Sequence, residues 1–416
     1  MNILVIGSGG REHALAWKIA QSLKAEKIFC SPGNAGMELM GCECVNIAAT
    51  DAQNLVTFAK KNKIDFAVIG PDAALEAGVA DAFAEANIPA FGPTRAAAII
   101  EYSKVFSKQF MKRHGIPTAT YASFSNFDAA CKHVENGSFP IVVKADGLAA
   151  GKGVIICTNA TEAYNALHQI MNDKTFGASG NSVVIEEYLE GSELSILAFC
   201  DGKTIIPMES AQDHKRAYDN DEGPNTGGMG TFSPSHIYTD SVKKECLENI
   251  FLPTVKGLTS EGIVFKGIIF FGLMLTKNGV KVIEYNARFG DPETQVVLPR
   301  LKSDLLDIMI ACTNGTLDKI TMEWDENAAA CVVLASKGYP GKVEDGVPIS
   351  GLSSSTSIIF HAGTKLTGTE IITAGGRVLG IVGRGSTVAG AANDAYNAVK
   401  SISFEGMHFR TDIGRK

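Results

Sequence analysis

Two lysines flank a turn rich in glycine and alanine in the segment VVKADGLAAGKGV, and this pattern suggests phosphate binding. A nucleotide P-loop has Gly, four residues and then Gly-Lys-Ser/Thr, because the hydroxyl must reach magnesium. Here only three residues separate Gly147 from Gly151, and Gly153 follows Lys152 where the hydroxyl residue should be. Lys144 and Lys152 therefore bind phosphate in some other arrangement, or bind none.

The segment VIEYNARFGDPETQ predicts a polar face on an otherwise apolar strand. Because side chains alternate along a strand, Glu284 and Asn286 point to one face and Tyr285 to the other. A carboxylate and an amide oxygen suit Mg²⁺, which otherwise keeps water and substrate phosphate as ligands. Arg288 continues this face, and its guanidinium could bind a carboxylate or phosphate through two hydrogen bonds. The alternative is an exposed polar face on an edge strand.

Two further segments carry polar residues that could bind a substrate. In VVIEEYLEGSELS, Glu187 could accept an adenine or ribose donor and Glu193 a ribose hydroxyl, although a solvated acidic turn is the alternative. The segment QDHKRAYDNDEGPNTGGMG, residues 212–230, is polar and ends in several glycines, which is typical of an active-site loop. Its histidine, His214, indicates nothing alone.

The turn GSGGREHAL follows the first predicted strand and opens the first helix. Its glycines would let backbone amides approach a phosphate at the positive end of the helix. A dinucleotide fingerprint needs a third glycine where Glu12 stands, and an acidic residue at the end of the second strand, where the sequence has CSPGNAG. Both departures disfavour NAD. Arg11 favours an anion site over a purely structural turn.

The composition fits a soluble enzyme with several domains. A chain of 416 residues exceeds what one core supports, so we expect two to four domains. Hydrophobic residues make up 45% and charged residues 20%, which is ordinary for a globular enzyme. The formal charge of -7 argues against a general nucleic-acid binder, but it leaves room for a small anionic substrate.

Cysteine usage and the N-terminal segment both suggest the cytoplasm. The nine cysteines include no CxxC pair, so we expect mostly buried thiols in a reducing compartment. The sequence enters a strand at once, with MNILVIG, and shows neither a basic leader nor a cleavable apolar stretch. No apolar run reaches the length of a membrane span. We therefore expect a cytoplasmic protein with no membrane partner.

The elements that position these residues follow from the apolar patterns. The first hundred residues alternate strands such as NILVIG with helices such as EHALAWKIAQSL, which predicts a parallel sheet with helices on both faces. From about Lys104 a helix ends at Gly115, and strands of an antiparallel or mixed sheet follow, with Asn278 and Gly279 as a hairpin turn. After NAAACVVLAS a glycine-rich unit begins, with short strands and a closing helix. The predicted fold class is α/β.

Taken together, the motifs resemble one enzyme family. IVVKADGLAAGKGV, VVIEEYLEG, QDHKRAYDNDEGPNTGGMG and EYNARFGDPETQ occur in this order and are similar to those of the phosphoribosylamine–glycine ligases, within the ATP-grasp superfamily. GSGGREHAL, SPGNAG, HAGT and TAGGRVLG extend the resemblance over essentially the whole chain. It implies an N-terminal parallel-sheet (Rossmann-like) domain over residues 1–103, a two-lobed ATP-grasp centre over 104–325 with a flexible lid lobe at about 119–190, and a small C-terminal α+β domain over 326–416.

The resemblance also implies a role for each motif. In that superfamily ATP lies between two α/β lobes, Lys144 contacts the α- and β-phosphates, and DGLAAGKG would fold over the terminal phosphates. The implied nucleotide contacts are Lys104, Lys144, Gly147, Gly151, Gly153, Glu186, Glu187, Leu189 and Glu193. The implied ligands of Mg²⁺ or Mn²⁺ are Glu284 and Asn286. The implied substrate contacts are Gly9, Gly10, Arg11, Asp213, Lys215, Asn225, Thr226, Gly227, Arg288 and Glu293, and the implied catalytic residues are Arg288, Lys144 and Asp291.

The implied reaction activates a carboxylate with ATP. Transfer of the γ-phosphoryl group to glycine gives glycyl phosphate, and the amine of 5-phosphoribosylamine then displaces phosphate to give glycinamide ribonucleotide. This route belongs to de novo purine biosynthesis and needs charge neutralisation, positioning and exclusion of water, but no covalent nucleophile. We expect small-molecule partners, no nucleic acid, and a monomer or weak dimer.

The sequence departs from the family pattern at three places. Asp72 and Ala74 stand where Glu and Pro are more frequent, Lys337 stands where Gly is usual, and Phe271 precedes the glycine of FFGLM. The strand FFGLMLT also lacks the extra metal-binding carboxylate of many ATP-grasp relatives. The open alternatives are an ATP-binding module without turnover, an ATP-grasp ligase or carboxylase for another purine precursor, and an oxidoreductase.

Overall fold

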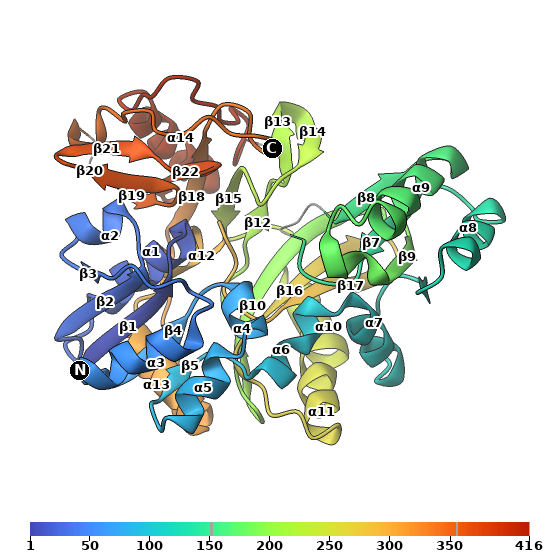
Figure 1. Cartoon of the computed structure of the whole chain (residues 1–416), viewed down its shortest axis with the longest axis horizontal. Helices are drawn as coiled ribbons and strands as arrows, with labels where there is room; N and C mark the ends of the chain where they lie inside the picture. Colours follow the sequence, from blue (N-terminus) through green and yellow to red (C-terminus); the bar gives the residue numbers. More distant parts are fainter. Residues whose placement is uncertain (150–152, 355–356, 416) are drawn as a thin grey trace.

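A computed structural model of the chain describes residues 1–149, 153–354 and 357–415. Figure 1 shows the N-terminal and C-terminal regions stacked on one side of the molecule, while the green lobe of the central region extends to the other side. Gly151 and Lys152, which the sequence assigned to a phosphate-covering loop, lie outside the described residues. None of the described helices is long and apolar enough to cross a lipid bilayer.

The N-terminal region forms the parallel sheet that its apolar runs predicted, with strand order β3-β2-β1-β4-β5. β1 is buried along most of its length, as expected for a strand covered on both faces. The strands are β1 (Asn2–Gly7), β2 (Lys27–Pro32), β3 (Glu43–Cys44), β4 (Phe66–Ile69) and β5 (Ala90–Phe91). The helices are α1 (Gly10–Ile19), α2 (Ala35–Leu39), α3 (Ala52–Lys61), α4 (Asp72–Glu76), α5 (Val79–Glu85) and α6 (Arg95–Tyr102).

The lid lobe is a small unit with its own hydrophobic core. Its four antiparallel strands have the order β6-β9-β7-β8, and apolar residues such as Val143, Leu167 and Ile185 pack together within the lobe. The short strand β8 was not predicted, because it follows the glycine-rich turn directly. Its elements are β6 (Tyr121–Phe124), α8 (Phe127–Glu135), β7 (Ile141–Ala145), β8 (Val154–Cys157), α9 (Ala160–Leu167) and β9 (Val183–Glu187). The preceding helix, α7 (Lys104–Arg113), packs instead into the core shared with the N-terminal domain.

The central antiparallel sheet packs tightly against the N-terminal domain, with strand order β11-β10-β16-β17. Ile6 and Phe271 belong to one shared hydrophobic cluster, and Val5 and Phe199 to a second. The predicted hairpin is confirmed, since Gly279 has φ +102° at the start of β17. The elements are β10 (Ser192–Asp201), β11 (Ile205–Pro207), α10 (Asp240–Cys246), α11 (Leu252–Ser260), β16 (Lys266–Thr276), β17 (Gly279–Asn286), α12 (Thr294–Val297) and α13 (Leu305–Asn314).

The C-terminal sheet has the strand order β12-β15-β18-β22-β19, and two of its strands, β12 and β15, come from the central part of the chain. Residues 212–230, expected as a polar loop, instead contain short strands, because β12 pairs with β15 and the chain between them folds back as the hairpin β13–β14. β15 pairs in turn with β18. The elements are β12 (Gln212–Asp213), β13 (Arg216–Tyr218), β14 (Glu222–Asn225), β15 (Gly230–Ser233), β18 (Ala328–Ala335), β19 (Ile358–His361), β20 (Thr364–Thr367), β21 (Glu370–Thr373), β22 (Arg377–Gly385) and α14 (Val388–Val399).

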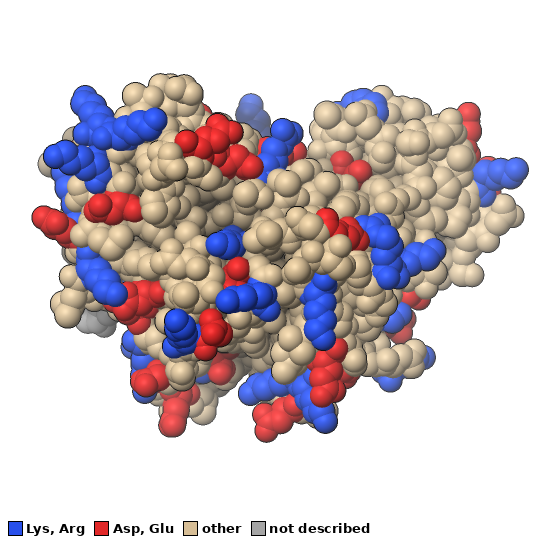
Figure 2. Space-filling view, turned by 90° about the horizontal axis from the view of Figure 1, so that it is seen from below, with Lys and Arg blue, Asp and Glu red and all other residues tan. Residues whose placement is uncertain are grey.

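The cysteines are free thiols, as expected from their spacing, and seven of the nine are buried. On the face seen in Figure 2, basic and acidic side chains intermingle over the surface.

Buried histidines join the N-terminal and C-terminal domains and predict acid sensitivity. His13 Nδ1 accepts a hydrogen bond from the backbone N–H of His361 at 2.8 Å. Burial lowers the pKa of His13 to about 3 and that of His361 to about 4. The unfolded chain therefore binds more protons than the folded chain between about pH 6.5 and 4, and stability falls as the pH falls through this window.

Replacing His13 with Asn should make this pH dependence shallower, because Asn can accept the same hydrogen bond but cannot be protonated. The free energy of unfolding, measured with urea from pH 6.5 to 4.5, should lose about 1.4 kcal/mol less per pH unit in the variant than in the parent. Equal slopes in the two proteins would show that His13 is not a buried neutral histidine.

Candidate functional site

The two residues assigned to metal share one face of β17, as the alternation predicted. Tyr285 is buried on the opposite face, where its hydroxyl lies 2.9 Å from Thr254 Oγ1. Glu284 and Asn286 are partly exposed. Within the described part of the chain, neither side chain forms a hydrogen bond or an ion pair. Two oxygen ligands of the kind that Mg²⁺ prefers therefore face the site without a protein partner.

Glu284 stands among cations from several elements. Burial raises the pKa of the Glu284 carboxyl, but Lys215, Lys144 and Lys104 outweigh burial and hold this pKa below its ordinary value. Glu284 is therefore an ionised carboxylate at neutral pH. The described residues contain no group of three His, Cys, Asp or Glu side chains arranged to hold a metal ion. Any metal here needs oxygen ligands beyond these two residues, such as water or phosphate.

The start of the glycine-rich turn is tied to the N-terminus of α7. Ser103 caps α7, and the Asp146 carboxylate accepts hydrogen bonds from Ser103 Oγ at 3.2 Å and from the Val105 N–H at 3.1 Å. The Lys104 ammonium donates to the Gly147 carbonyl at 3.1 Å. The N-terminus of α7 thus positions both Lys104 and the entry to the turn.

The turn leaves and re-enters the lid sheet at neighbouring points. The Ala145 N–H donates to the Gly153 carbonyl at 2.8 Å, which joins the two ends. Gly147 has φ +139°, and a Cβ at this position would lie 2.3 Å from Ser179 Oγ, so only glycine fits. The described nucleotide residues of this segment, Lys144, Gly147 and Gly153, therefore lie together at one edge of the lobe.

The remaining predicted nucleotide contacts lie on or just after β9. The Glu187 carboxylate is held by the Thr120 N–H at 2.8 Å and by Lys281 at 2.9 Å, so a ligand would have to compete for this carboxylate. Leu189 is partly buried in the connection to β10. Glu193 is exposed on β10, and its carboxylate lies 3.2 Å from Lys215 Nζ. Glu186, one of the predicted contacts, is instead buried between two lysines.

One of those lysines, Lys108, was missed by the sequence analysis. It lies one helical turn after Lys104 on α7 and is only 2% exposed. The spacing of four residues could have pointed to it, since such residues share a helix face.

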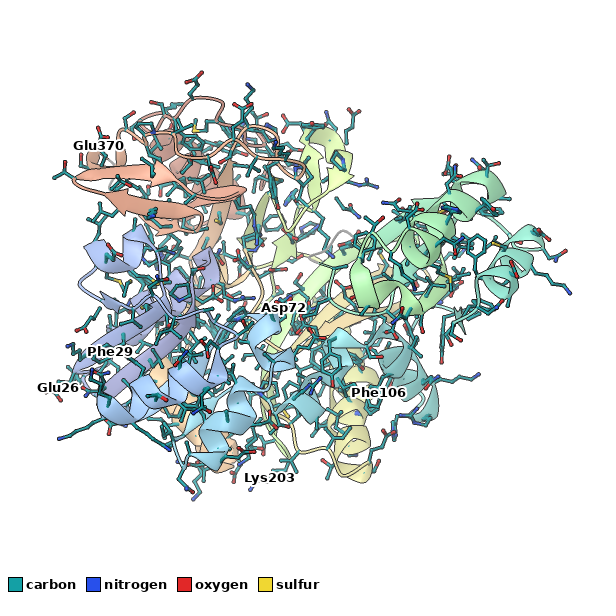
Figure 3. The ribbon with its side chains drawn as sticks, in the orientation of Figure 1. Glu26, Phe29, Asp72, Phe106, Lys203 and Glu370 are labelled. Atoms are coloured by element: carbon teal, nitrogen blue, oxygen red, sulfur yellow. The ribbon has the colours of Figure 1, made fainter. Side chains whose placement is uncertain are left out.

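Arg288 is anchored by carboxylates of the N-terminal domain. Its Nη2 lies 3.0 Å from Glu101 Oε1 and 3.9 Å from Asp72 Oδ2. Glu101 also accepts the Ala287 N–H at 2.7 Å, which fixes the chain after β17. The Nε atom of Arg288 is buried and lacks a hydrogen-bond partner among the described residues. Figure 3 places the label of Asp72 near the centre of the molecule, where the domains meet.

The pKa values of Asp72 and Glu101 are shifted in opposite directions. Burial raises the pKa of Glu101, and Arg288 opposes this only in part. Burial also acts to raise the pKa of Asp72, but Arg288 and then Arg11 outweigh burial and leave this pKa below its usual value. The departure of Asp72 from the family pattern therefore still gives Arg288 an acidic neighbour.

Asp291 belongs to a junction organised by Arg377, a residue of the motif TAGGRVLG that had no predicted role. Arg377 Nη1 donates to the carbonyls of Gly227 at 2.6 Å and Asp291 at 2.8 Å, and it lies 3.4 Å from Asp291 Oδ1. Gln295 donates to Asp291 Oδ1 at 2.8 Å. Arg377 lies at the start of β22, so the C-terminal domain positions Gly227, a predicted substrate contact, and Asp291, a predicted catalytic residue.

The other predicted substrate residues converge from β12 and from the segments around it. A Cβ on Gly228 would lie 2.7 Å from Asp213 and 2.4 Å from Pro292, so this glycine lets the two segments approach. Burial, and then Glu293, raise the pKa of Asp213 well above its usual value. Burial likewise raises the pKa of Glu293, which accepts a hydrogen bond from Ser195 at 3.1 Å.

Lys215, Asn225 and Thr226 lie along the hairpin β13–β14 and its edges. Thr226 Oγ1 donates to the Lys215 carbonyl at 2.9 Å and accepts from the Gly228 N–H at 2.9 Å. Asn225 ends β14, opposite Arg216. The Lys215 ammonium, paired with Glu193, connects this group to the proposed ribose contact. The structure thus brings these residues to the same junction as Asp213.

The glycine turn before α1 is covered by protein side chains. Glu12 Oε2 accepts the Gly9 N–H at 2.7 Å, and a Cβ on Gly10 would lie 2.6 Å from the Gln295 amide nitrogen. The Arg11 guanidinium lies 2.5 Å from Glu12 and donates to the Phe289 carbonyl at 3.1 Å. Glu12, which breaks the dinucleotide fingerprint, therefore occupies the helix N-terminus itself. The assignment of Gly9, Gly10 and Arg11 to a substrate phosphate stays a prediction.

The chain matches three family models in order. They are described as the phosphoribosylglycinamide synthetase N domain, at residues 1–101, its ATP-grasp (A) domain, at 102–294, and its C domain, at 329–416. A relative from Halalkalibacterium halodurans, named phosphoribosylamine–glycine ligase, is 50% identical over 418 residues, which cover 100% of this chain and 97% of the relative.

Solved structures show similarity to the same family. The crystal structure of phosphoribosylamine–glycine ligase from Thermotoga maritima matches with a TM-score of 0.87 and 32% identity, over 99% of this chain and 100% of that one. The biotin carboxylase domain of Hydrogenobacter thermophilus 2-oxoglutarate carboxylase, described in complex with MgADP and bicarbonate, matches with a TM-score of 0.76 over 98% of this chain and 91% of that one. At 15% identity, this second likeness shows the fold alone.

Proposed function

The chain belongs to the phosphoribosylglycinamide synthetase family, and we propose that the residues at its domain junction carry out that family's reaction in the roles set out here. The protein is an ATP-dependent ligase that joins glycine to 5-phosphoribosylamine in purine biosynthesis. We further propose a cytoplasmic location and a monomer or weak dimer.

The single observation that carries the proposed site is the position of Glu284. Glu284 and Asn286 present oxygen atoms that have no partner among the described residues, and Lys215, Lys144 and Lys104 lower the pKa of Glu284. The pair fits Mg²⁺ or Mn²⁺ bound together with phosphate oxygens, since hard cations of this kind take oxygen ligands. A bound metal would neutralise charge on the phosphates during transfer.

In the first step, the γ-phosphoryl group of ATP passes to a carboxylate oxygen of glycine. Lys104 and Lys144 would hold the phosphates and reduce the repulsion between two anions, while the backbone from Glu186 to Leu189 would hold adenine. Arg288, with its free Nε, would orient the glycine carboxylate. Glycyl phosphate and ADP result.

In the second step, the amine nitrogen of phosphoribosylamine attacks the acyl carbon and phosphate leaves. Asp213 and Glu293 are proposed to receive the proton that the amine loses, because a carboxylate with a raised pKa is a better base near neutral pH. Lys215, Asn225, Thr226 and Gly227 would line the ribosylamine side, with Asp291 fixed by Arg377.

Trapping the intermediate tests this proposal. With ATP, glycine and hydroxylamine in place of phosphoribosylamine, the enzyme should form glycine hydroxamate together with ADP, because hydroxylamine attacks acyl phosphates. If the enzyme makes glycinamide ribonucleotide but yields no hydroxamate, this would contradict a glycyl phosphate intermediate that is accessible in the site.

Replacing Arg11 with Ala tests the proposed phosphate contact of the N-terminal domain. Two of its nitrogens have protein partners, and the described residues give Nη2 none. The substrate phosphate carries about two negative charges, so losing a charge-assisted hydrogen bond should raise KM for phosphoribosylamine about tenfold or more. The KM values for ATP and glycine should barely change.

The outcome also separates binding from structure. If Arg11 serves only to hold Glu12 and the Phe289 carbonyl, the variant should melt at a lower temperature and all three KM values should move together or stay unchanged. Either of those results would remove Arg11 from the phosphate site.

A further inference from the structure

Two buried lysines share one carboxylate in the nucleotide-binding lobe. Lys144 on β7 and Lys108 on α7 are 4% and 2% exposed, and Glu186 on β9 is 4% exposed. Lys108 Nζ lies 3.0 Å from Glu186 Oε2, and Lys144 Nζ lies 3.0 Å from Glu186 Oε1. The group therefore carries one more positive than negative charge. Such an excess is unfavourable in a buried site unless something else balances it.

The two lysines are held differently. Lys108 contacts three residues from three places in the fold: Glu186, the Thr118 hydroxyl at 2.7 Å and the Ile283 carbonyl at 3.4 Å. Two of these contacts are hydrogen bonds, to Thr118 and to Ile283, and the contact with Glu186 is an ion pair at 3.0 Å. Thr118 is itself fixed, since its hydroxyl donates to the Val282 carbonyl at 2.6 Å. Lys108 is thus held by residues from three parts of the fold.

Among the described residues, Lys144 donates hydrogen bonds to Glu186 Oε2 at 3.1 Å and to the Ile283 carbonyl at 3.4 Å. Although Lys144 Nζ lies at ion-pair distance from Glu186 Oε1, that oxygen is buried without a hydrogen bond. The two side chains are therefore joined by a hydrogen bond through Oε2 alone. Lys144 lacks the contact that Lys108 makes with Thr118, so fewer residues hold Lys144 in place.

We infer that Lys108 is a positioning residue: it keeps Glu186 neutralised, so that Lys144 can leave this carboxylate and bind the phosphates of the nucleotide. Without Lys108, the departure of Lys144 would leave the buried Glu186 carboxylate without a cationic partner, which is strongly unfavourable. With Lys108 in place, Glu186 stays paired, and the excess positive charge is balanced by phosphate. This inference rests on the proposed contact between Lys144 and the phosphates.

A charge-removal cycle tests the inference. The variants are Lys108→Met, Lys108→Arg, Glu186→Gln and the double variant, and the measurement is calorimetric binding of a non-hydrolysable ATP analogue and of adenosine. Lys108→Met should weaken the ATP analogue at least tenfold and leave adenosine within about twofold, because only the phosphates need Lys144. Lys108→Arg keeps the charge and should recover most of the affinity.

The double variant gives the decisive comparison. Once residue 186 is a neutral Gln, it needs no cationic partner when Lys144 moves to the phosphates. The double variant Lys108→Met with Glu186→Gln should therefore bind the ATP analogue almost as tightly as the parent. If the two substitutions are additive, or if Lys108→Met weakens adenosine as much as the analogue, Lys108 has only a structural role. Glu186→Gln alone should bind the analogue at least as tightly as the parent, and weaker binding would contradict the inference even if Lys108→Met fails to fold.

Two controls separate this inference from the proposed function. Lys112→Met, an exposed lysine on the same helix, should change neither affinity. Lys144→Met should weaken the ATP analogue strongly. If it does not, the proposed role of Lys144 is wrong. If Lys144→Met does weaken the analogue, but the effects of Lys108→Met and Glu186→Gln on binding simply add, only the role of Lys108 is overturned.

Discussion

Replacing Glu284 with Gln should abolish turnover while the protein still binds ATP. Glu284 provides the only charged oxygen ligand proposed for the metal, and its loss should cost at least about 3 kcal/mol of transition-state stabilisation, or a hundredfold in kcat. ATP affinity should weaken only moderately, because Lys104, Lys144 and the backbone near Glu186 still hold the nucleotide. The measurements are kcat over a range of magnesium concentrations and the Kd of ATP.

A matched control for this experiment is Glu370→Gln, an exposed glutamate on β21 at the periphery of the molecule (Figure 3). It should leave kcat and the magnesium dependence unchanged. Near-normal activity of Glu284→Gln at low magnesium would refute Glu284 as the metal ligand.

Replacing Arg288 with Lys should lower kcat/KM for glycine by roughly a hundredfold, although the positive charge is kept. The guanidinium meets Glu101 through Nη2 and keeps Nε free, whereas an ammonium cannot present two donors in one plane. A loss of this size is typical when one donor to a developing charge is removed. Glycine kinetics at saturating ATP give the value.

The structural contribution of Arg288 has to be separated from its chemical one. A lysine still neutralises Glu101, so the melting temperature should change little, and the Kd of ATP should stay the same. Arg113→Lys is the matched control, because Arg113 pairs with Glu261 on the surface, where such pairs are worth little. If Arg288→Lys only lowers the melting temperature and leaves glycine kinetics intact, Arg288 is structural.

Local patterns predicted the fold well where one physical rule dominates. The buried run NILVIG gave a central parallel strand, and the turn at Asn278 and Gly279 gave the β16–β17 hairpin. The segment 212–230 was expected to be a polar loop, but its β12 pairs with β15, and β15 is paired in turn with β18, a strand about a hundred residues later. Pairing over such separations leaves no signal in the local sequence.

In the candidate site, too, local patterns predicted some features, while contacts between distant segments were not predicted. Alternation along β17 predicted that Glu284 and Asn286 share a face opposite Tyr285, and the structure confirms this arrangement. The partners Glu101, Lys108 and Arg377 were not predicted, because each reaches the site from a different domain or helix face. The covering of Gly9 by Glu12 also depends on side-chain packing and could not be read from the glycines alone.

The most direct test of the assigned reaction is ADP release measured with ATP, glycine and freshly prepared phosphoribosylamine, each omitted in turn. We expect ADP, phosphate and glycinamide ribonucleotide in equal amounts when all three substrates are present. Omission of either glycine or phosphoribosylamine should remove the product and nearly all ADP release. ADP release at the same rate without phosphoribosylamine or without glycine would contradict the assigned reaction.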